Sequence, residues 1–169
     1  MVEKETIFSS KVSYTGIFSF KDFYKFCYDW LKDEAGMDPL SEIKYEEKIV
    51  GDIKNIIVKW KGEKKVTDYF KFEMEVNFKI EKLANVEITQ GGAKVSTNSG
   101  KVEVETKGNL VRDWQGKFEL TAFKKFLRSI YEKWVIPARV EEYKEKLAKD
   151  CDEFLGQAKA YLDLEGRKG

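Results

Sequence analysis

The side chains of this chain that could carry out catalysis are carboxylates, lysines, tyrosines and two cysteines, because the sequence contains no histidine. Without histidine there are no Ser–His or Cys–His nucleophile pairs, and the commonest general base and metal ligand is missing. Cys27 and Cys151 lie far apart and form neither a Cys-x-x-Cys pair nor a zinc-ligand pattern. Both fall on apolar helical stripes, so we predict two reduced, buried thiols, with a disulfide or a reactive thiol as the alternative.

Paired carboxylates act as general acid and base in many enzymes, and they occur at three places in this sequence. The pairs are Glu73 and Glu75, Glu103 and Glu105, and Glu141 and Glu142. Each is expected on the solvent side of a strand or helix, away from the apolar surroundings that raise a carboxyl pKa towards catalytic use. Ser99-Gly100-Lys101 lacks the rest of a phosphate-binding loop. We therefore predict that the chain is not an enzyme and uses no cofactor or metal.

The composition indicates one domain over residues 1–169, a length that can bury a sizeable core. Charged residues make up 36% of the chain, but Lys and Arg (31) nearly balance Asp and Glu (30). A nucleic-acid-binding domain normally has a strong basic excess, so we expect no nucleic-acid partner. The polar N-terminus lacks the apolar region of a signal peptide, and no apolar run is long enough to span a membrane, so we expect a cytoplasmic protein.

The elements that must position these residues are mostly strands in residues 1–120 and helices in residues 121–165. Alternating apolar residues predict a first strand over about residues 6–18. Ser19 is a suitable cap for a helix over residues 20–35, which Gly36 can end.

Residues 41–114 change from helical to alternating spacing and predict further antiparallel strands. The clearest strand has six apolar residues in strict alternation: Phe70, Phe72, Met74, Val76, Phe78 and Ile80. Gly91-Gly92 and Asn98-Ser99-Gly100 are predicted turns. The predicted fold is therefore α+β, with an antiparallel sheet of about seven strands and a helix inserted after the first strand.

The C-terminal region contains two helical stripes that Pro137 separates, because proline cannot donate the backbone hydrogen bond and clashes with the preceding turn. We predict one helix over about residues 121–135 and a second from Pro137 to about Leu164. The first is expected to cover the core of the sheet through Phe126, Ile130 and Trp134.

This order of strand, helix, antiparallel strands and long C-terminal helix resembles the helix-grip superfamily of START and birch-pollen-allergen proteins. The resemblance lies in the order of elements and not in a sequence motif. It implies a cavity between sheet and helix that holds an apolar small molecule or lipid. The implied lining residues are Tyr14, Trp60, Phe72, Met74, Phe78, Val104, Phe126, Ile130 and Trp134. The alternative is a core that these large side chains fill.

Two further hypotheses concern the C-terminal helices. The stripe of the second helix is heptad-like and would suit a homodimer or packing on its own domain. It consists of Val140, Tyr143, Leu147, Cys151, Phe154, Ala158 and Tyr161. The first helix combines aromatic residues with lysine and arginine, as interfacial membrane helices do, although a helix covering a core has the same composition. We expect binding of an apolar molecule or lipid, with a protein-interaction module as the next hypothesis and membrane attachment as the least favoured.

Overall fold

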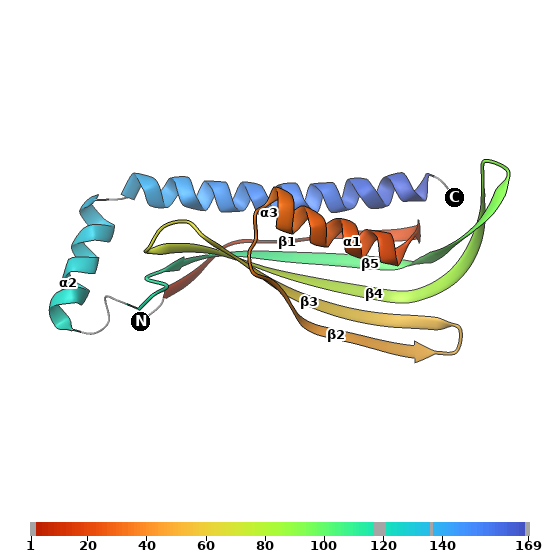
Figure 1. Cartoon of the computed structure of the whole chain (residues 1–169), viewed down its shortest axis with the longest axis horizontal. Coiled ribbons are helices and arrows are strands. Elements are labelled where there is room, and N and C mark those ends of the chain that lie inside the picture. The colour runs from red at the N-terminus through yellow and green to blue at the C-terminus, as the bar shows by residue number, and fades with distance from the viewer. Residues whose placement is uncertain (1–2, 117–120, 136, 168–169) are drawn as a thin grey trace.

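The structure, a computed structural model, describes residues 3–116, 121–135 and 137–167. Its elements are β1 (Glu3–Phe18), α1 (Phe20–Asp29), η1 (Trp30–Glu34), β2 (Leu40–Val50), β3 (Ile53–Lys65), β4 (Phe70–Gln90), β5 (Ala93–Arg112), α2 (Ala122–Ile130), η2 (Tyr131–Val135) and α3 (Pro137–Gly166). The π-helical turns η1 and η2 directly follow α1 and α2. Figure 1 shows a long curved sheet with α3 and α1 on one face and α2 at one end.

The sheet has five antiparallel strands in the order β1-β5-β4-β3-β2. The first strand therefore pairs with the last, and β1 and β2 form the two edges. The predicted α+β class and antiparallel sheet are confirmed, and the arrangement is compatible with a helix-grip architecture. The predicted strand count of about seven is wrong, because the segments after Phe70 form two long strands instead of several short ones.

The strand count is lower for two reasons: β4 continues without a break from Phe70 to Gln90, and only one of the two predicted turns forms. Gly91 and Gly92 have positive φ angles of 57° and 81° and connect β4 to β5. Gly100 instead lies inside β5, where an added Cβ would be 3.0 Å from the carbonyl oxygen of Glu81 and 3.2 Å from the Cα of Leu83. Position 100 therefore requires glycine because the β4 backbone lies too close for a side chain, and not because the chain turns there.

The predicted helix over residues 20–35 corresponds to α1 and η1. The Ser19 hydroxyl accepts a hydrogen bond from the backbone N–H of Asp22, which satisfies one of the free donors at the helix start. Gly36 follows the last turn with a φ of 71°, as expected for a residue that ends a helix. α1 buries Phe23 and Cys27, and η1 buries Leu31.

The second C-terminal helix begins at Pro137, as predicted, and packs along β1 and β5 (Figure 1). Its apolar stripe is buried in its own domain at Val140, Leu147, Cys151, Phe154 and Ala158. A homodimer through this helix would therefore have to use the opposite, charged face.

α3 approaches the sheet closely at Gly108 of β5. A Cβ added there would lie 2.8 Å from Cys151 Sγ and 3.2 Å from Leu147 Cγ. We predict that Gly108→Ala lowers the free energy of unfolding by about 1–3 kcal/mol through overpacking. Gly156, which is exposed on α3 with no atom near an added Cβ, provides the control. Gly156→Ala should raise the same free energy by about 0.5–1 kcal/mol in denaturant titrations; equal effects of the two substitutions would contradict this packing.

Candidate functional site

Six of the nine predicted lining residues lie in the core beneath α1 and α3. Tyr14, Trp60, Phe72, Met74, Phe78 and Val104 are all buried. The Trp60 ring lies 4.7 Å from Phe78 and 5.0 Å from Tyr24, and Phe78 pairs across the sheet with Val104. The Tyr14 hydroxyl donates to the carbonyl oxygen of Ile17. These six side chains therefore contribute to a packed core in which large aromatic groups contact one another.

The other three predicted lining residues lie on α2 and η2 and do not reach the core. The prediction that Phe126, Ile130 and Trp134 cover the sheet is corrected, because their exposed fractions are 59%, 38% and 72%. Phe123 and Leu127, on the same side of the helix, are 68% and 41% exposed. We call these five residues the exposed apolar face. Their spacing of three or four residues places them on one side of a helix of 3.6 residues per turn.

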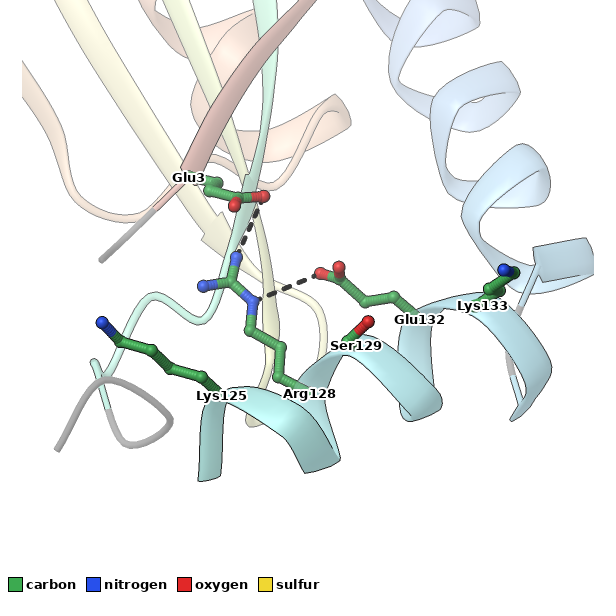
Figure 2. Close-up of a pocket in the computed structure, with 6 residues that line it drawn as sticks. All are labelled: Glu3, Lys125, Arg128, Ser129, Glu132 and Lys133. Atoms are coloured by element: carbon green, nitrogen blue, oxygen red, sulfur yellow. Dashed lines mark ion pairs between the residues drawn. The ribbon is translucent and has the colours of Figure 1, made fainter. Parts of the chain in front are cut away.

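The side of α2 that faces the rest of the protein is charged, and Arg128 is its centre. Its guanidinium lies 3.0 Å from Glu3 and 3.8 Å from Asp113, and Nε lies 3.5 Å from Glu132. Figure 2 shows the Arg128 side chain between Glu3 of β1 and Glu132. Arg128 is buried although it is always charged, so these carboxylates compensate for its loss of water.

Tyr69, in the loop before β4, also contacts Arg128 and so helps to hold α2 against the protein. Its hydroxyl accepts a hydrogen bond of 2.7 Å from Arg128 Nε and donates one to Glu132. Its ring lies 5.6 Å from that of Tyr131. Burial and the neighbouring Glu132 raise the pKa of Tyr69. Burial alone would lower the pKa of Arg128, but Tyr69, Glu3 and Glu132 raise it. At neutral pH Tyr69 therefore stays neutral and Arg128 stays cationic.

α2 is therefore attached to the protein in the opposite sense to a usual amphipathic surface helix, whose apolar side is buried. Two exposed lysines, Lys124 and Lys133, flank the apolar face, and a third, Lys125, lines the charged side of the helix. Within the described part of the chain, none of them forms an ion pair with a carboxylate. Lys133 Nζ lies 5.5 Å from the centre of the Trp134 ring.

An open groove of about 530 Å³ lies on the charged side of α2 (Figure 2). Its lining residues are Glu3, Lys125, Arg128, Ser129, Glu132 and Lys133. The two carboxylates of this groove are already paired with Arg128, and none of its lining residues is hydrophobic or aromatic, unlike those of most small-molecule sites. The exposed apolar face is therefore the stronger candidate for a functional site.

The carboxylate Glu73 was expected on a solvated strand face, and the structure corrects that expectation. Glu73 is buried, 2.6 Å from Lys4 Nζ and 3.6 Å from Lys61 Nζ, and accepts a hydrogen bond of 3.2 Å from Asn109. Burial would raise its pKa, but these partners lower it below the usual value. Glu73 therefore stays ionised at neutral pH and cross-links four strands, which is the opposite of a poised catalytic acid.

The two cysteines are free and buried, as predicted. Burial raises the pKa of Cys27 well above its usual value and, with Asp150 and Asp152 nearby, that of Cys151 to about 12. Because the thiolate is the reactive form, we predict that the folded protein does not react with a thiol reagent at neutral pH. The unfolded protein should react at both thiols. Since Cys151 holds its proton more tightly when folded, its contribution to stability should fall as the pH rises from 9.0 towards about 12.

That prediction can be checked by counting reactive thiols and by measuring unfolding free energies across the same pH range. The variant Cys151→Ala serves as the control, and its stability should change less in alkali than that of the unmodified chain. One thiol reacting rapidly in the folded state would contradict the burial of these groups.

The sequence pattern identified the apolar side of α2 but not the direction in which that side faces, which depends on the partners of Arg128 in β1 and in the turn after β5.

Across residues 3–116, 121–135 and 137–167, no group of three or more Cys, Asp or Glu side chains is placed to hold a metal ion. Among the same residues, no helix is long and apolar enough to cross a membrane. A scan against models of known protein families finds no match, and a search among curated proteins finds none either.

Proposed function

We propose that the chain is a non-enzymatic attachment module that docks through the exposed apolar face of α2 and η2. The observation that carries this proposal is the orientation of α2, whose charged side packs against the protein and whose apolar side faces water. Its charged side is held against the protein by Arg128, while Phe126, Ile130 and Trp134 face water. Single exposed apolar residues are common on proteins, but a continuous group of this size marks an interaction surface.

The energetics support this proposal. Covering a side chain of the size of phenylalanine or leucine contributes about 1.5–3 kcal/mol when burial is complete. Five partly exposed side chains on one short helix therefore provide a substantial driving force for association. Because Arg128 already fixes the orientation of the helix, little conformational freedom has to be lost on docking.

Two other functions receive less support from the described residues. Membership of the START-like helix-grip superfamily would add an apolar ligand between the sheet and the helices, but large buried side chains occupy that region. A homodimer through α3 would need an apolar stripe, and the stripe of α3 packs on β1 and β5.

A photoreactive benzoyl-phenylalanine at position 126 tests the attachment function without assuming a class of partner. The probe protein is added to a whole extract of the producing cells, membranes included, and illuminated. The same probe at position 164 is the matched control, because Leu164 is 58% exposed on α3. We expect adducts, whether to lipid or protein, at position 126 in clear excess over position 164. Equal labelling, or none at 126, would contradict the proposal.

A further inference from the structure

We propose that the surface onto which α2 and η2 dock is a lipid bilayer with anionic headgroups. This inference rests on the attachment function above and specifies the partner of the same face. Three observations support it: the arrangement of lysines around the exposed apolar face, the position of α2 in the molecule, and the shape of the face.

The lysines flank the apolar face in the way that an interfacial helix requires. Lys124 directly follows Phe123 at one edge of the apolar face, and Lys133 Nζ lies 5.5 Å from the centre of the Trp134 ring at the other end. When that face enters the acyl region, both ammonium groups lie at the level of the headgroups. Neither forms an ion pair with a carboxylate of the described residues, so both are available to lipid phosphates. The chain as a whole carries a formal net charge of only +1, so this cationic character is local.

The position of α2 suits a flat partner. Figure 1 shows α2 at one extreme of the long axis of the molecule, running across that axis. Figure 2 shows Arg128 and Glu132 directed towards the strands, so the apolar side chains on the opposite side point away from the protein. A planar surface can therefore contact the full length of the helix without meeting the sheet or α3.

The shape and composition of the face also favour a bilayer over a folded protein. The face is a single convex helix surface, with exposed fractions of 59% for Phe126 and 72% for Trp134. A protein partner would need a matching groove, whereas lipid adapts to a convex apolar surface. Tryptophan is enriched at the boundary between headgroups and acyl chains, where its ring is half apolar and half hydrated.

Flotation with vesicles tests this inference. The full-length protein is mixed with vesicles of phosphatidylcholine, with or without phosphatidylserine, at low ionic strength. We expect binding to the phosphatidylserine vesicles that weakens with added salt. Lys124→Gln with Lys133→Gln should reduce the partition coefficient by about fivefold per lysine, which corresponds to ~1 kcal/mol each. Phe126→Ser with Trp134→Ser should reduce it by about thirtyfold.

Matched controls come from exposed residues at other places on the protein. Lys48→Gln with Lys94→Gln removes the same charge from β2 and from the start of β5, and Leu164→Ser removes an exposed apolar side chain from α3. All three control substitutions should leave vesicle binding unchanged. Because every altered residue is exposed, all variants are expected to keep the unfolding transition of the unmodified protein, which circular dichroism verifies.

The remaining outcomes separate the lipid inference from the attachment function. No binding to phosphatidylserine vesicles, together with protein adducts at position 126, would overturn the lipid partner and leave the attachment function standing. If those adducts contain a second copy of this chain, the lipid partner is likewise overturned and the attachment function stands. Undiminished vesicle binding after Phe126→Ser with Trp134→Ser would overturn the assignment of the surface itself. No vesicle binding and no adducts would overturn both proposals.

Discussion

Replacing Arg128 with alanine is expected to release α2 from the protein. The substitution removes the cation from a site that holds Glu3, Asp113 and Glu132. Removing one partner of a buried ion pair costs about 3–5 kcal/mol, because the opposite charge keeps its desolvation penalty. Since Glu3 is partly hydrated, we expect about 3 kcal/mol here. A released helix of this length is marginal in water, so it should also lose its structure.

Hydrogen exchange measures this release directly. The protection of backbone amides in residues 122–135 should fall by about one-hundredfold in Arg128→Ala, whereas protection in β4 and β5 is retained. Arg139→Ala is the matched control, because Arg139 is exposed on α3 and forms no ion pair with the described residues. If both variants retain full protection of α2, the charged contact does not hold the helix.

Replacing Phe154 with alanine is expected to have the largest effect on global stability. Phe154 is fully buried on α3, with its ring 5.7 Å from that of Trp30, and it connects the C-terminal helix to η1. Deleting a buried phenylalanine side chain removes its burial energy and leaves a cavity, which typically costs about 3–5 kcal/mol. Denaturant titration should show this loss as a lower midpoint of unfolding.

Leu164→Ala is the control for this experiment, since Leu164 is on the same helix but largely exposed. Its unfolding free energy should change by less than about 0.5 kcal/mol. The comparison also tests where the heptad-like stripe packs. If Phe154 served a dimer interface in solution, the stability lost in Phe154→Ala would depend on protein concentration. A loss that is independent of concentration is expected.

Local patterns in the sequence predicted the elements well, because their causes are local. The alternation from Phe70 to Ile80 predicts a strand with one buried side, and Ser19 and Gly36 mark the ends of a helix through their own backbone and side-chain chemistry. Pro137 divides the C-terminal region because it cannot donate a helical hydrogen bond. Each of these features needs only neighbouring residues and is found in the structure.

The features that the sequence did not predict depend on residues distant in the chain. Gly100 resembles a turn residue, but its role is set by the backbone of Glu81 and Leu83 in β4. Glu73 alternates with apolar residues as a solvated residue would, but Lys4 and Asn109 from two other strands bury it. The sequence of α2 shows an apolar side, whereas Arg128 and its partners decide that this side faces outward.

The most direct measurement of the attachment surface uses an environment-sensitive fluorophore, NBD, on a single introduced cysteine at position 126 or 164. Cys27 and Cys151 are buried and need not be removed. On addition of phosphatidylserine vesicles, the emission of NBD at position 126 should shift to shorter wavelength, as expected for transfer from water into the acyl region. The emission at position 164 should not shift. An unchanged spectrum at position 126, or an equal shift at both positions, would contradict attachment through α2 and η2.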